Sequence, residues 1–374
     1  MRVLIAAGGT GGHIYPGITV AQVLRDKGAE IIFVGTKAGL EADVIPRAGF
    51  RLETIRAHHI PRKFSWKIPL ALATAGLGTY RAMRIIRKFR PHVVMGTGGY
   101  VSGPVILAAA ALRYPTLIHE QNAYPGVTNR LLAKIVDQIA VGYEEAKSFF
   151  PPEKTVVTGN PVRPEISACT REAGRRLFGL DPNKRTLLVT AGSQGARSVN
   201  RALLEAAPML NARRDLQVLH AAGRALYPEI VETLRKQGVK VDEDGEMIRY
   251  GNIRIVPYIY SMPEALAAAD LVVGRGGTLS SAEFTVRGLP AILVPYPYAA
   301  EDHQMHNAQV LEKHGAAKVI PDREINGEVL ADLVIQLLDS PSRLQSMARA
   351  SKRLGKPDAT ERLVALVTSL ARQS

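Results

Sequence analysis

Apolar and polar positions along the chain repeat a unit of three parts: a short apolar run, a glycine cluster, and a stretch with apolar residues at helical spacing. The first unit begins at residue 2, where RVLIAA leads into GGTGGHIYPG and then into Ile18, Val20, Ala21 and Leu24. Similar runs are IIFVG near residues 32–35, HVVMGTGG at 92–99, TLIHE at 116–120 and KTVVTGN at 154–160. Such units are typical of strands and helices that alternate in a parallel sheet.

The same pattern restarts after the polar stretch DPNKR at 181–185. The second series consists of TLLVTAGSQGA, LQVLHAAG, IRIVPY, DLVVGRGG and PAILVPY. Glycine loops begin at Gly8 and Gly96 in the first series, 88 residues apart, and at Gly192 and Gly274 in the second, 82 residues apart. This internal duplication predicts an α/β protein with two Rossmann-like, doubly wound domains that face each other across a cleft. We expect them to join near residues 159–166, where two prolines interrupt any regular element.

Composition agrees with two folded domains, since the chain has 374 residues and is 46% hydrophobic. Its one cysteine, Cys169, excludes an intrachain disulfide and a cysteine-cluster zinc site, and it favours a reducing compartment. The uncharged stretch 91–112 contains His92, glycines and two prolines, so we expect no membrane span there. The N-terminus shows no secretory signal pattern.

The charge of the chain predicts an anionic partner. The formal net charge is +14, and residues 51–100 carry ten basic residues and one acidic residue. Such a patch suits nucleic acid, a phosphorylated substrate or an acidic membrane surface, and it also occurs on an ordinary solvated face. Few aromatic side chains accompany the basic residues, which argues against nucleic acid.

The glycine loops are candidate anion sites, because a tight turn followed by a helix start presents backbone N–H groups. Ile14 and Val101 stand where the dinucleotide fingerprint needs its last glycine, and no GxxxxGK[ST] motif occurs. His13 closes the first loop and could remove a proton near neutral pH, or it could simply bond to the backbone at a helix start. Glu283 follows the loop near 275 and could accept ribose hydroxyls, or it could only complement the helix dipole.

Seven motifs, in order and over nearly the whole chain, resemble those of the MurG family of bacterial glycosyltransferases. They are GGTGGHIYPG at 8–17, GTGGYVSGP at 96–104, HEQNAYPGVTN at 119–129, GNPVR at 159–163, AGSQGA at 191–196, RGGTLSSAE at 275–283 and DHQMHNA at 302–308. This family attaches N-acetylglucosamine to the lipid-linked muramyl-pentapeptide precursor of peptidoglycan. The resemblance implies a GT-B architecture. It gives an acceptor domain, residues 1–162, joined by a C-terminal helix at 352–374, and a UDP-sugar donor domain, residues 163–351.

The resemblance also implies two sets of binding residues. Those expected to contact UDP-N-acetylglucosamine are Thr10, Gly11, Gly12, Asn122, Arg163, Ser193, Ile259, Thr278, Leu279, Ser280, Ser281, Ala282, Glu283, Gln304 and Asn307. Those expected at the acceptor diphosphate are Gly11, Gly12, Gly98, Gly99 and Tyr100. Arg163 and Ser193 would bond the donor diphosphate, Ile259 would offer backbone groups to uracil, and Gln304 with Asn307 would contact sugar hydroxyls.

We expect a single displacement with inversion, in which the acceptor's C4 hydroxyl attacks the anomeric carbon. His13 is the preferred general base and Glu120 the second candidate. No metal cofactor is expected if helix N-termini and Arg163 stabilise the leaving diphosphate. The competing interpretations are another GT-B enzyme, such as a UDP-sugar epimerase, and a basic nucleic-acid-binding protein.

The segment from residue 58 to about 90 suggests how such an enzyme would reach a lipid-linked substrate. Phe64 and Trp66 stand among Arg62, Lys63 and Lys67, a combination suited to insertion at an anionic membrane surface. We therefore expect peripheral binding at the cytoplasmic face of the cell membrane, with other cell-wall synthesis proteins as further candidate partners. The helical pattern that follows could equally be an ordinary domain helix with Ala82, Ile85, Ile86 and Phe89 in the core.

Overall fold

The computed structural model describes residues 1–57, 68–192, 194–239 and 247–372, which form two compact units. Unit 1 comprises residues 1–162 and 356–374, and unit 2 comprises residues 163–355. The chain thus crosses between the units twice, the second time after Gly355. We expected the return to begin at residue 352, whereas the preceding helix continues to Leu354.

Unit 1 is built on a parallel sheet of seven strands in the order β3-β2-β1-β4-β5-β6-β7. The strands are β1 (Arg2–Ala6), β2 (Glu30–Gly35), β3 (Arg51–Thr54), β4 (Val93–Gly96), β5 (Thr116–Glu120), β6 (Gln138–Val141) and β7 (Thr155–Val157). The first six follow the Rossmann strand order, with a topological switch point between β1 and β4. β1, β2 and β5 are buried on both faces, as expected when helices cover both sides of a parallel sheet.

Helices cover both faces of the unit 1 sheet. They are α1 (Gly11–Asp26), α2 (Glu41–Arg47), α3 (Ile68–Phe89), α4 (Gly99–Ala111), α5 (Val127–Leu132) and α15 (Ala359–Ala371), with 3₁₀ turns at Glu144–Phe149 and Pro152–Lys154. Alternate strand residues face opposite sides, so Leu4 packs with α3, α4 and α5, whereas Val3 and Ile5 pack with α1, α2 and α15. The C-terminal helix α15 therefore completes the core of unit 1 through Leu363 and Val367.

Unit 2 also has a sheet of seven strands, which shows the same Rossmann order once the outer strand β10 is set aside. Its order is β10-β11-β9-β8-β12-β13-β14, and only the pair β10 and β11 is antiparallel among the described strands. The strands are β8 (Arg185–Thr190), β9 (Leu216–Ala221), β10 (Ile248–Tyr250), β11 (Ile253–Val256), β12 (Leu271–Gly274), β13 (Ala291–Leu293) and β14 (Ala317–Val319). The switch point of this unit lies between β8 and β12.

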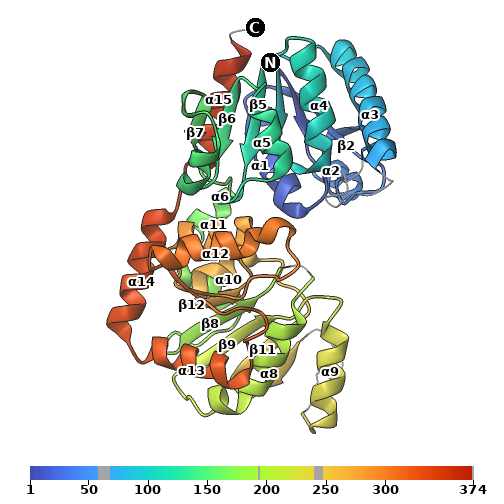
Figure 1. The fold of residues 1–374 in the computed structure, drawn as a ribbon. Coiled ribbons are helices and arrows are strands. Elements are labelled where there is room, and N and C mark those ends of the chain that lie inside the picture. Colours follow the sequence, from blue (N-terminus) through green and yellow to red (C-terminus); the bar gives the residue numbers. More distant parts are fainter. Residues whose placement is uncertain (58–67, 193, 240–246, 373–374) are drawn as a thin grey trace. The chain divides into compact units, whose positions relative to one another are not determined.

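The helices of unit 2 again lie on both sides of the sheet (Figure 1). They are α6 (Pro164–Ala168), α7 (Arg171–Leu177), α8 (Arg197–Asn211), α9 (Tyr227–Lys236), α10 (Met262–Ala268), α11 (Thr278–Arg287), α12 (His303–Lys313), α13 (Gly327–Leu338) and α14 (Pro341–Leu354), with a 3₁₀ turn at Ala300–Asp302. Leu187 and Val189 of β8 pack into a core with α8, α9 and α13. The two Rossmann-like halves expected from the duplicated sequence pattern are confirmed.

Candidate active site

Two glycine loops of unit 1 close on each other at its switch point. A Cβ atom at Gly99 would lie 2.2 Å from the carbonyl oxygen of Gly8, and one at Gly98 would lie 2.8 Å from Nδ1 of His13. Gly98 and Gly99 also have φ of 94° and 74°, which larger residues avoid. The N-termini of α1 and α4 therefore meet beside His13, and both present backbone N–H groups. The residues expected at the acceptor diphosphate lie together here, including Tyr100, whose ring is 3.3 Å from the Cβ position of Gly9.

A buried carboxylate fixes the first of these loops. Glu41, at the start of α2, is fully buried, and its Oε2 accepts a hydrogen bond from the N–H of Gly9 at 3.2 Å. Its Oε1 accepts from the N–H of Thr36 at 3.0 Å and from the Thr36 hydroxyl at 2.6 Å. The sequence analysis missed this residue, because an acid at a helix start has an ordinary local explanation.

Hydrogen bonds to the His13 ring determine which of its two nitrogens carries the proton. Nδ1 lies 3.1 Å from the carbonyl oxygen of Thr97 and 3.2 Å from Oε1 of Gln121. Both are acceptors, so Nδ1 carries the proton and Nε2 has the lone pair that a general base needs. Gln121 in turn donates from Nε2 to Thr97 O at 2.7 Å and to Nδ1 of His119 at 3.2 Å. Burial lowers the pKa of His119 to about 4, so it is neutral and can accept this bond.

Glu120, the second candidate base, is engaged within its own loop. It is 2% exposed. Its Oε1 accepts from the N–H and the side-chain amide of Asn122, and its Oε2 accepts from the N–H of Gly126 and from Nδ2 of Asn129. In this arrangement the carboxylate stabilises the turn after β5. Asn122, expected at the donor, is likewise buried in this network.

Glycines also shape the loops at the switch point of unit 2. A Cβ atom at Gly195, in the loop after β8, would lie 2.0 Å from the carbonyl oxygen of Ala222. One at Gly276, in the loop after β12, would lie 2.2 Å from the carbonyl oxygen of Gln304 at the start of α12. Gly277, the N-cap of α11, has nothing within 4 Å of its Cβ position, so the start of α11 is open to a ligand.

Arg163 and Glu283 form an ion pair of 3.3 Å in unit 2. The Glu283 side chain is 18% exposed and that of Arg163 is 47% exposed. Burial raises the pKa of Glu283, and the neighbouring Arg163 opposes that rise. Arg163, which is expected at the donor diphosphate, and Glu283, which is expected at the donor ribose, are therefore neighbours.

The other expected donor residues divide into accessible and buried ones. Leu279, Ser280 and Ala282 on α11 are partly exposed, whereas Thr278 and Ser281 are buried. Asn307 is also buried, and its Nδ2 donates to the carbonyl oxygen of Gly276 at 3.2 Å, so it holds the loop before α11. The side chain of Ile259 is buried, which leaves its backbone for recognition. Gln304 accepts a hydrogen bond from the N–H of Tyr296 at 3.0 Å.

Six expected site residues lie outside the residues that the structure describes. They are Ser193 and the membrane candidates Arg62, Lys63, Phe64, Trp66 and Lys67.

The sequence did not predict a cation–π cluster that lies beside Ile259 in the chain. The Arg224 guanidinium lies 4.8 Å from the ring centre of Tyr258 and 5.1 Å from that of Tyr260. Arg224 is 36 residues from Tyr260 in sequence, so no local pattern predicts the cluster.

Two Rossmann-like units with glycine loops at their switch points define the GT-B fold, and the family models identify a glycosyltransferase. Residues 3–141 match the glycosyltransferase family 28 N-terminal domain, and residues 186–363 match the family 28 C-terminal domain. Within that class, the chain belongs to the MurG family, the UDP-N-acetylglucosamine–N-acetylmuramyl-(pentapeptide) pyrophosphoryl-undecaprenol N-acetylglucosamine transferases. The resemblance noted from the motifs is therefore confirmed.

Relatives and solved structures match this chain over nearly its full length. The Moorella thermoacetica transferase is 47% identical over 98% of each chain, and the Desulforamulus reducens transferase is 45% identical over 99% of each. The crystal structure of Acinetobacter baumannii MurG has a TM-score of 0.78 at 29% identity and covers 98% of this chain and 99% of its own. A putative UDP-N-acetylglucosamine 2-epimerase from Listeria monocytogenes has a TM-score of 0.66 at 17% identity, covering 100% of this chain and 97% of its own, and shares the fold alone.

Proposed function

We propose that this chain transfers N-acetylglucosamine from UDP-N-acetylglucosamine to the C4 hydroxyl of a lipid-linked N-acetylmuramyl-pentapeptide, with inversion at the anomeric carbon. The observation that carries the proposal is the 47% identity over 98% of both chains with a transferase named for this donor and acceptor. The structural neighbours named as epimerases are at most 17% identical among those compared and support only the fold.

The two units divide the work in this proposal. Unit 1 binds the acceptor, with its diphosphate at the joined N-termini of α1 and α4. Unit 2 binds the donor, with the diphosphate at the open start of α11 and at Arg163, and the ribose at Glu283. Thr10, Gly11, Gly12 and Asn122 would add donor contacts from unit 1.

The chemical step forms a bond from the acceptor oxygen to the anomeric carbon and breaks the bond from that carbon to the UDP oxygen. Nε2 of His13 takes the hydroxyl proton, because Nδ1 already carries one and donates it to Thr97 and Gln121. Helix N–H groups and Arg163 stabilise the charge that develops on the leaving UDP, so the proposed reaction needs no metal cofactor.

The acceptor also implies a membrane location. No helix in the described part of the chain is both long and apolar enough to span a bilayer. We propose peripheral binding to anionic lipid at the cytoplasmic face through the segment that holds Phe64 and Trp66, where other cell-wall synthesis proteins are also candidate partners. This segment is basic by sequence, which favours anionic headgroups.

The experiment that tests the function uses the full-length protein, radiolabelled UDP-N-acetylglucosamine and a lipid-linked muramyl-pentapeptide. The expected result is a labelled disaccharide lipid together with free UDP. His13→Ala should lower turnover by about 10² to 10⁴ while donor affinity changes little, since a base acts in the transition state. Epimerisation of the donor without transfer would instead favour the alternative enzyme class.

A further inference from the structure

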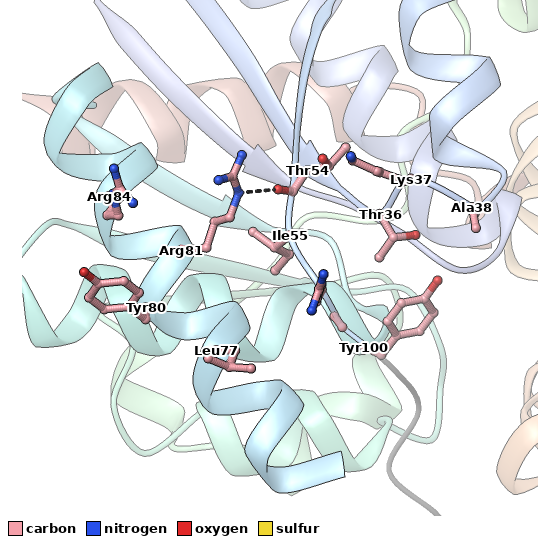
Figure 2. Close-up of a pocket in the computed structure, with 13 residues that line it drawn as sticks. Thr36, Lys37, Ala38, Thr54, Ile55, Leu77, Tyr80, Arg81, Arg84 and Tyr100 are labelled. Atoms are coloured by element: carbon pink, nitrogen blue, oxygen red, sulfur yellow. Dashed lines mark hydrogen bonds between the residues drawn. The ribbon is translucent and has the colours of Figure 1, made fainter. Parts of the chain in front are cut away.

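An open groove of about 700 Å³ lies in unit 1, and His13 is not among its lining residues (Figure 2). Thr36 and Lys37 follow β2, Thr54 ends β3, and Arg81 comes from α3 on the opposite wall. The groove is therefore at the carboxyl ends of parallel strands, the edge where doubly wound sheets bind ligands. Its volume is within the range of small-molecule sites.

The groove is strongly cationic. Lys37, Arg56, Arg81 and Arg84 line it, and none of the described lining residues is acidic. The sequence contains no Asp or Glu between Glu53 and Glu120, so α3 itself supplies no acidic neighbour to these cations. Glu30 and Glu53 lie on the far side of Arg81 and Arg84, in a separate pocket that the two arginines also line. Anions are attracted to such a concave surface, because its low-dielectric walls concentrate the field of the charges.

Two contacts give the groove a defined shape. The Nε of Arg81 donates to the carbonyl oxygen of Thr54 at 3.0 Å, which orients its guanidinium at the wall (Figure 2). A Cβ atom at Gly78 would lie 2.5 Å from the carbonyl oxygen of Arg56, so a glycine is needed for α3 to approach the segment after β3 this closely. Leu77 and Tyr80, on the exposed side of the same helix, are 60% and 61% exposed and add apolar surface.

The groove is continuous with the loops proposed to bind the acceptor diphosphate. Tyr100 lines the groove and also lies over Gly9. Glu41 accepts hydrogen bonds from both Gly9 and Thr36, so one buried carboxylate joins the glycine loop to the groove wall. A substrate whose diphosphate lies at the glycine loop can therefore extend into the groove.

We propose that this groove binds the peptide of the acceptor through its carboxylates, which rests on the proposed function. A peptide attached through its amino end carries at least its terminal carboxylate, and guanidinium groups pair with carboxylates through two parallel hydrogen bonds. Arg56 and Arg84 make these pairs, while Tyr80 and Leu77 cover the apolar parts of the peptide. The groove is concave, with strand ends on one wall and α3 on the other, which suits a short chain better than a flat membrane surface.

The test compares acceptors that carry a short, water-soluble prenyl chain. One bears the pentapeptide, the second bears the same peptide with its carboxylates converted to amides, and the third bears no peptide. Acceptor KM, donor KM and kcat are measured for wild type, Arg56→Gln, Arg84→Gln and the double variant. Arg87→Gln is the matched control, since Arg87 is an exposed arginine on α3 that does not line the groove. Thermal unfolding verifies that each variant is folded.

The expected result is an acceptor KM raised about 10-fold by each groove substitution on the pentapeptide acceptor, with donor KM unchanged and Arg87→Gln without effect. Wild type should show a similar rise on the amidated acceptor, and the groove substitutions should then add little. Equal effects on all three acceptors would overturn the proposal, because the groove would not distinguish peptide carboxylates. Weaker sedimentation of the double variant with anionic vesicles, at unchanged KM for soluble acceptors, would assign the groove to lipid headgroups instead. Absence of transfer by wild type to any acceptor would refute the proposed function and the inference together, whereas normal transfer with unchanged KM ratios would refute the inference alone.

Discussion

Gln121→Met tests whether the hydrogen bonds around His13 determine which of its ring nitrogens carries the proton. Gln121 is 1% exposed, and it accepts from Nδ1 of His13 and donates to Thr97 O and to Nδ1 of His119. Methionine has nearly the same length but none of these polar groups. The substitution removes one of the two acceptors of the His13 proton and leaves the other, the Thr97 carbonyl, in place.

The expected magnitudes follow from these contacts. One neutral hydrogen bond contributes a net ~0.5–1.5 kcal/mol, so kcat should fall roughly 2- to 13-fold if the lost bond helps to keep Nε2 free as the base. Stability should also fall, because Nδ1 of the buried His119 loses its donor, which costs about 1–3 kcal/mol. The matched control is Gln217→Met, since Gln217 is another buried glutamine, 6% exposed, that bonds to Thr186 and Asp181 in unit 2.

The assay measures kcat for transfer of labelled N-acetylglucosamine, with chemical denaturation to follow stability. Gln217→Met should lose stability while kcat stays near wild type. The double variant His13→Ala, Gln121→Met should be no slower than His13→Ala alone, because Gln121 acts on turnover only through His13. Additive losses in the double variant, or an equal loss of kcat in Gln217→Met, would refute the role given to Gln121.

Three further predictions concern the donor, pH and the membrane. Glu283→Ala should weaken UDP-N-acetylglucosamine binding roughly 10- to 150-fold in calorimetry, from the ~1.5–3 kcal/mol of a charged hydrogen bond, and unchanged affinity would remove this residue from the site. Burial lowers the pKa of His119 and of His220 from 6.5 to about 4. As the pH falls, these two imidazoles therefore bind protons in the unfolded chain before they do so in the folded chain. Their contribution to stability is complete above pH 6.5 and is lost as the pH falls toward 4, and a constant free energy of unfolding between pH 7 and 5 would contradict this. Wild type should sediment with anionic vesicles at low salt, whereas a Phe64→Ser, Trp66→Ser variant should sediment less, and equal sedimentation of both would place the membrane contact elsewhere.

The sequence alone determined the fold class and the family. Apolar strands, glycine turns and helical spacing are local features, because each depends on residues within a few positions of one another. They were therefore readable at GGTGGHIYPG and again at RGGTLSSAE, and the duplicated series predicted two Rossmann-like halves. The join near residues 159–166 was readable for the same reason, since prolines act on their immediate neighbours.

Tertiary structure decided which of these local features meet. β1 and β4 pair although two strands lie between them in sequence, so loops 88 residues apart close around His13. The glutamine that orients this histidine is 108 residues away, which no periodicity records. Asn307 belongs to a matched motif, yet the fold buries it against the loop before α11. The cationic groove also depends on tertiary structure, because it exists only where the ends of β2 and β3 meet α3. Such long-range contacts depend on packing of the whole sheet rather than on any short stretch of sequence.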